Sequence, residues 1–98
     1  MECNRTVICG EIIRLGALRF TPAGLPVIDF VIQHQSRRRE ANITRKIQCE
    51  LQAVALGETA KAITELNTFE SVKISGFLSR KSHTNQQLVL HVEHIVQI

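Results

Sequence analysis

Aromatic side chains are scarce in this sequence, which has no tryptophan, no tyrosine and only four phenylalanines. Phe30 is expected in the core and Phe69 at the start of a strand. For Phe20 and Phe77, a core or dimer contact is favoured over exposure. Few rings are then left on which a ligand could stack. Any ligand would have to be held mainly by charged and polar side chains.

Long apolar runs are also missing. Stretches such as 7–9 and 53–56 fall far short of the roughly 20 residues that cross a bilayer. No apolar core follows the N-terminal residues, as a signal peptide requires. We therefore expect a cytoplasmic protein. Its 98 residues fit one domain, residues 1–98, with a core thin enough that a homodimer is a reasonable expectation.

The three cysteines, Cys3, Cys9 and Cys49, are odd in number and lack the paired spacing of a disulfide framework or a zinc site. Cys9 and Cys49 lie within apolar stretches, so we expect both to be buried as small hydrophobic residues. Cys3 is expected to be an exposed thiol near the N-terminus.

Motifs for catalysis, metal binding or a cofactor are absent as well. The sequence has no GxSxG elbow, no HExxH pair and no Walker or dinucleotide glycine motif. Asp29 is the only aspartate. His91 and His94 are three residues apart, which places their side chains on opposite faces of a strand. We expect no enzyme activity, no metal and no cofactor.

Charge is mildly positive, at +3, and unevenly distributed. More than half of the lysines and arginines fall in two short segments, which contain Arg37, Arg38, Arg39, Arg45 and Lys46, and then Arg80 and Lys81 together with His83. A run of arginines is often only a solvated loop. Two such segments nevertheless favour an acidic partner more strongly than one does.

The first half of the chain has the pattern of three strands. Residues 6–14 are β-branched and apolar, and a Thr-Pro-Ala-Gly-Leu-Pro turn at 21–26 precedes alternating residues at 27–35. Residues 47–55 alternate again. The polar, basic segment 36–44 between the last two strands is expected to be a loop or the tip of a hairpin that extends them.

In the second half of the chain, the spacing of the apolar residues changes. Apolar residues at helical spacing predict a helix of about three turns over residues 57–67. Residues 69–79 and 88–98 predict two further strands, joined by a polar loop at 80–87. Three strands, a helix and two strands is the order of the OB-fold, an all-β, five-stranded Greek-key barrel with one short helix between strands 3 and 4.

Both basic segments fall in connections of this predicted barrel, between the second and third strands and between the fourth and fifth. The architecture is expected to bring them together beside the ligand face of strands 2 and 3. Arg14 and Arg19, near the first turn, are expected to add to this positive surface. A positive groove that contacts phosphates predicts binding of a single nucleic-acid strand with weak sequence preference, steep salt dependence and modest affinity.

Several segments resemble a known family. Residues 10–14 and 18–30 are similar to the opening of bacterial single-stranded DNA-binding proteins. The segments His34-Gln35-Ser36, Gly76-Phe77-Leu78-Ser79 and Leu90-His91-Val92-Glu93-His94-Ile95 resemble, more particularly, the primosomal replication protein N (PriB) family. The lack of a long, acidic-tipped tail favours the same branch.

The resemblance implies an OB-fold homodimer that acts in the restart of stalled chromosomal replication. It implies binding to single-stranded DNA and to the helicase PriA, stimulation of unwinding, and contacts with the loader DnaT and the single-stranded DNA-binding protein. Arg14 matches a basic family position, and Ile43 and Gln48 stand where some relatives have aromatic residues. The candidate DNA-binding residues are therefore Arg14, Arg37, Arg38, Arg39, Arg45, Lys46, Gln48, Arg80, Lys81 and His83.

Two functions from different classes stay open. The first is a dimeric accessory protein of the primosome that binds single-stranded DNA through basic loops. The second, motivated by the missing aromatic residues, is a protein-interaction adaptor that docks on the helicase with only vestigial DNA binding. A general genome-coating binder comes third. The first strand is expected to contribute to the dimer, because it is apolar on both faces.

Overall fold

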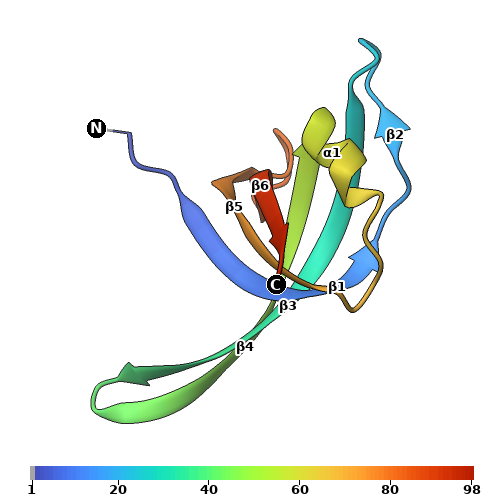
Figure 1. Ribbon diagram of the computed structural model, residues 1–98. Helices are drawn as coiled ribbons and strands as arrows, with labels where there is room; N and C mark the ends of the chain where they lie inside the picture. The colour runs from blue at the N-terminus through green and yellow to red at the C-terminus, as the bar shows by residue number, and fades with distance from the viewer. Residues whose placement is uncertain (1) are drawn as a thin grey trace.

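Five long strands close into a barrel in the computed structural model, which describes residues 2–98 (Figure 1). The elements in chain order are β1 (Thr6–Leu15), β2 (Arg19–Phe20), β3 (Pro26–Glu40), β4 (Ile43–Leu56), α1 (Glu58–Ile63), β5 (Ser71–Arg80) and β6 (Leu88–Gln97). The strands are ordered β1-β5-β6-β4-β3-β2, and β1 closes the barrel by pairing with β3. The predicted OB-fold, with a short helix between the third and fourth long strands, is confirmed.

Branched aliphatic side chains fill the barrel. The largest fully buried residues are Ile12, Ile28, Ile32, Ile63, Ile74, Leu90 and Val72. Ile63 comes from α1, and alternation along the strands sends the other six inward and their neighbours outward. Phe30 is buried with them, as predicted, and no polar or charged side chain within residues 2–98 is buried. Polar functional groups therefore lie on the surface of the barrel.

Strand β1 bends so that it can pair with two strands. Its residues from Thr6 to Glu11 pair with β5, and those from Glu11 to Leu15 pair with β3. Gly10 allows the close approach at the bend, because a Cβ atom there would lie 2.5 Å from the carbonyl oxygen of Gln33. In the part of the chain that the structure describes, the first half of β1 pairs with another strand along one edge only.

Strands β3 and β4 continue past the barrel as a two-stranded ribbon, seen at the lower left of Figure 1. We call residues 35–48 of this ribbon the arm. Its pairing ends at Glu40 and Ile43, and the two residues between them, Ala41 and Asn42, have φ of 50° and 62°. Positive φ at both positions is what a two-residue type I′ hairpin turn requires. The hairpin alternative predicted for this segment is thus correct.

The helix is shorter than predicted, ending at Ile63 instead of reaching residue 67. Beyond it, the hydroxyl of Thr64 donates a hydrogen bond to the carbonyl oxygen of Lys61. The backbone then tightens, because the N–H of Leu66 donates to Ile63. Strand β5 also starts later than predicted, at Ser71, since Phe69 has a φ of 70° that a strand does not accept.

The prediction for two cysteines is wrong, because Cys9 and Cys49 are both exposed. Cys9 is on the outer face of β1, and Cys49 lies where the ribbon leaves the barrel and the core has ended. Cys3 is exposed, as predicted. Among residues 2–98, the single short helix has neither the length nor the apolarity needed to span a membrane.

Candidate nucleic-acid interface

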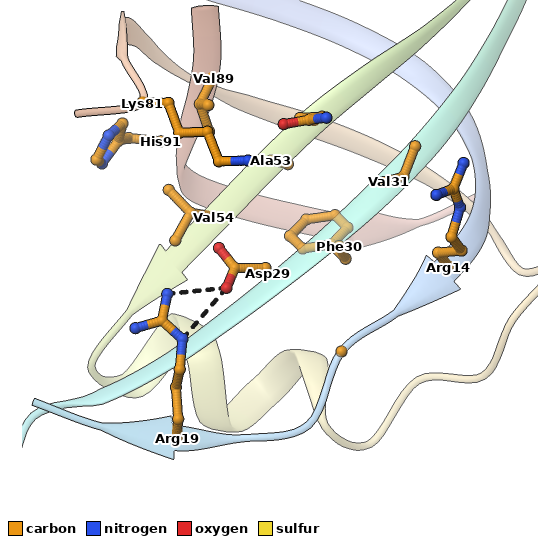
Figure 2. Close-up of a pocket in the computed structure, with 12 residues that line it drawn as sticks. Arg14, Arg19, Asp29, Phe30, Val31, Ala53, Val54, Lys81, Val89 and His91 are labelled. Carbon is orange, nitrogen blue, oxygen red and sulfur yellow. Dashed lines mark hydrogen bonds and ion pairs between the residues drawn. The ribbon is translucent and has the colours of Figure 1, made fainter. Parts of the chain in front are cut away.

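A groove of about 550 Å³ lies over the outer surface of β3 and β4 (Figure 2). Its lining includes Asp29 and Val31 of β3 and Gln52 and Val54 of β4. The cations come from three other places in the chain, namely Arg14, Arg19 and Lys81. In Figure 2, Arg14 lies to one side of the β3–β4 pair, and Lys81 and His91 lie on the other. The barrel thus gathers distant basic residues at one surface.

Two of the three groove cations are paired with acids. Arg19 donates hydrogen bonds to Asp29 Oδ2 at 2.8 and 3.2 Å, and Arg14 lies 3.4 Å from Glu50. These side chains are more than half exposed, so each pair stabilises the fold by no more than about 1 kcal/mol. Lys81 has no ion-pair partner within residues 2–98. A phosphate could therefore compete for all three cations.

The surface that carries the groove continues along the arm. Paired residues of an antiparallel ladder share a face, and faces alternate along each strand. Starting from Asp29 and Val31, every second residue of β3 and its partner on β4 therefore lie on the same side. We call this side the groove face. On the arm it carries Gln35, Arg37, Arg39, Thr44, Lys46 and Gln48.

Charge differs between the two faces of the arm. On the arm, the groove face has three cations, Arg37, Arg39 and Lys46, and no acid. The nearest acid on this face along β4, Glu50, lies at the base of the ribbon. On the opposite face, Arg38 is directly across from Arg45, which is 2.5 Å from the carboxylate of Glu40. The unneutralised charge of the arm is concentrated on the groove face.

The connection between β5 and β6 contributes one residue to the groove. Lys81 lines it, whereas Arg80 and His83 do not, and the guanidinium of Arg80 is 3.0 Å from His83 Nδ1. The backbone N–H of Lys81 donates to Gln87, which holds the loop closed at its base. The two basic segments are thus not gathered into one pocket, because the arm residues do not line this groove. Only Lys81 of the second segment lines the groove, whose β3–β4 surface continues along the arm.

Three of the four phenylalanines are exposed in the single chain: Phe20 by 63%, Phe69 by 73% and Phe77 by 37%. The core alternative for Phe20 and Phe77 is wrong, and a dimer contact for either stays a prediction. None of the three lines the groove.

Among the polar residues that line the groove, sequence reasoning missed Asp29, Gln52 and His91. Asp29 could have been found, since it is the only aspartate and faces outward in an alternating strand. His91 could not, because its place depends on how β6 packs beside β4. Across residues 2–98, no three His, Cys, Asp or Glu side chains converge as a metal site would need.

Comparison with known sequences gives consistent matches. Residues 4–94 match a family described as "Another single-strand binding protein family". A protein of Nitrosomonas europaea named replication restart protein PriB is 42% identical over 89 residues, which is 91% of this chain and 82% of the relative. Its namesake in Photorhabdus laumondii is 34% identical over 98 residues, covering 97% of this chain and 93% of the relative.

Solved structures show the same fold at lower identity. The protein priB of Ralstonia solanacearum superposes with a TM-score of 0.89 at 23% identity, covering 99% of this chain and 100% of that one. The SSB of Plasmodium falciparum, solved in complex with ssDNA, gives a TM-score of 0.83 at 16% identity and covers 100% of this chain and 96% of that one. At these identities the likeness concerns the barrel alone.

Proposed function

Because the chain belongs to the single-strand binding protein family, among relatives named replication restart protein PriB, we propose that it binds single-stranded DNA during replication restart. The observation that carries this proposal is the continuity of the groove with the groove face of the arm. One strand of DNA laid along this surface would meet Arg14 and Lys81 at the barrel, and then Lys46, Arg37 and Arg39 on the arm.

Phosphates are the part of the ligand that this surface suits best. Lysine and arginine side chains neutralise phosphates whatever the base sequence, and the counterions released make affinity fall as salt rises. The surface is open and exposed, so an extended strand can enter it from the side. We expect binding with little sequence preference and a strong dependence on ionic strength.

A fluorescence anisotropy titration with a labelled oligonucleotide, repeated over a series of salt concentrations, tests the proposal. Each phosphate contact on a single strand adds about 0.7 to the slope of log K against log salt. Five contacting cations would give a slope of roughly 3.5. No binding even at the lowest salt would contradict the proposal.

A second candidate function is the adaptor that docks on the helicase PriA and stimulates it. Contacts with DnaT belong to the same class of function. Exposed apolar residues outside the groove favour it, among them Phe20, Leu25 and Phe69. Helicase unwinding in the presence of an Arg37→Ala/Arg39→Ala/Lys46→Ala variant separates the candidates. Stimulation that survives the loss of DNA binding would support the adaptor, and stimulation lost together with DNA binding would support the first proposal.

A homodimer formed through β1 is part of the same proposal. In support, the stretch from Thr6 to Gly10 has one edge without a hydrogen-bonded strand among residues 2–98, and Val7 there is 48% exposed. A second copy of the strand could add to that edge. Light scattering on the purified protein should give twice the 11.0 kDa of one chain. A mass of one chain at all concentrations would exclude the dimer.

A further inference from the structure

We propose that His91, supported from behind by Phe77, is a stacking site for one nucleobase of a bound strand. The inference rests on the proposed function and adds to it a contact with a base, which the basic residues do not make. Such a site would let a chain without tryptophan or tyrosine stack on a base.

The two rings form a fixed pair on neighbouring strands. Phe77 of β5 and His91 of β6 are direct cross-strand partners. Their ring centroids are 4.9 Å apart, and their planes differ by only 9°. Parallel planes at this separation correspond to the offset stacked arrangement that aromatic pairs prefer. Phe77 therefore holds the imidazole in one orientation before any ligand arrives.

The imidazole of His91 is the member of the pair that reaches the groove. His91 lines it and Phe77 does not. Since Phe77 is stacked against one side of the ring, the groove is reached by the part of the ring that Phe77 leaves uncovered. The other three histidines lie elsewhere. His34 is on the face of β3 opposite the groove face, hydrogen-bonded to Ser36 and to the carbonyl oxygen of Cys9. His83 is hydrogen-bonded to Arg80, and His94 is exposed and does not line the groove.

The surroundings of His91 fit a nucleotide. Val54 and Val89 line the groove beside it and provide an apolar wall, and Lys81 supplies an ammonium group for the adjoining phosphate. Figure 2 shows Lys81 and His91 on the same side of the groove, beyond β4. Every base has a π-face, so such a site accepts any of the four bases. Lys81 and His91 would then bind one nucleotide between them.

The first test uses the wild-type protein and the ring protons of its histidines, followed by NMR. A thymidine oligonucleotide of about 15 nucleotides, near the upper site size of one OB-fold, is compared with an abasic strand of equal length. The His91 ring signals are expected to move upfield with the thymidine strand and to stay in place with the abasic strand. Equal shifts with both strands, or none, would overturn the stacking site.

The second test measures affinity. His91→Ala should bind the thymidine strand about fivefold more weakly, the low end of the range for loss of one base-stacking ring. Its affinity for the abasic strand and its salt dependence should not change. His94→Ala is the matched control, because His94 is an exposed histidine of the same strand that does not line the groove.

The outcomes separate this inference from the proposed function. If His91→Ala and His94→Ala bind the thymidine strand as tightly as the wild type does, the stacking site is excluded and DNA binding stands. If the wild type binds neither strand at low salt, the proposed function itself fails. If His91→Ala is too unstable to measure, the wild-type NMR comparison still decides.

Discussion

The guanidinium of Arg19 donates two hydrogen bonds to a single carboxylate oxygen of Asp29, at 2.8 and 3.2 Å, inside the groove proposed to bind DNA (Figure 2). Asp29 thereby places an oxygen where a phosphate oxygen could bind Arg19. The pair is exposed, so its strength in water is modest. The carboxylate both neutralises Arg19 and repels an incoming phosphate.

Replacing Asp29 with Asn should therefore strengthen DNA binding. Loss of the carboxylate releases Arg19 and removes a negative charge from the groove, which should raise affinity at low salt by roughly fivefold. The salt dependence should also steepen by about 0.7 in slope, as expected for one more phosphate contact. The measurement is the anisotropy titration over a salt series.

Glu40→Gln is the matched control for Asp29→Asn. It also removes a carboxylate paired with an arginine, but Glu40 and Arg45 lie on the face of the arm opposite the groove face. Its affinity should equal that of the wild type. If both variants bind more tightly by the same factor, net charge and not the position of Asp29 is responsible.

The two faces of the arm should contribute unequally to DNA binding. Arg37→Ala/Arg39→Ala should lower the slope of log K against log salt by about 1.4, because two phosphate contacts are lost. Arg38→Ala, which removes the arginine between them, should change the slope little. Equal losses from both variants would mean that DNA contacts the arm on both faces.

A substitution in the turn at the tip of the arm should stabilise the arm. Ala41 has a φ of 50°, which costs a residue with a Cβ about 1 kcal/mol relative to Gly. Ala41→Gly should thus increase the protection of arm amides against hydrogen exchange. Asn42→Ala should decrease it, since Asn tolerates positive φ better than Ala does. Unchanged exchange in both variants would show that the turn does not limit arm stability.

Gly76 should be intolerant of any side chain. A Cβ atom there would lie 1.8 Å from the carbonyl oxygen of His91, so β5 and β6 would have to separate. Gly76→Ala should cost more than about 3 kcal/mol of unfolding free energy in a urea titration. Gly24→Ala is the comparison, because Gly24 has open space around it and only its φ of 83° opposes the change, at about 1 kcal/mol.

Much of the barrel could be predicted from sequence because each strand alternates and each turn has characteristic residues. The buried positions Ile28, Phe30 and Ile32 follow directly from the two-residue period. The same period misled the prediction for Cys49, since the alternation continues into the arm after the barrel interior has ended. Periodicity identifies a face of a strand but does not say whether anything covers that face.

The candidate site was less predictable because it depends on register. The sequence places Arg37, Arg38 and Arg39 together as one basic run, whereas the structure divides them between two faces. The pairing of Phe77 with His91 follows a register shift at Ser75 and Gly76, which no local pattern reveals. Contacts between distant segments are set by such shifts and by barrel closure.

The β3–β4 ladder runs from the barrel to the tip of the arm without a register shift, so one set of hydrogen bonds governs both parts. This unbroken register determines what a change in the length of the arm would do. Adding two residues to each strand of the arm would keep Arg37 and Arg39 on the groove face, while adding one to each, on the barrel side of the arginines, would turn them to the other side. Between the barrel and the arginines, functional arms of related proteins should therefore differ in length by even steps per strand.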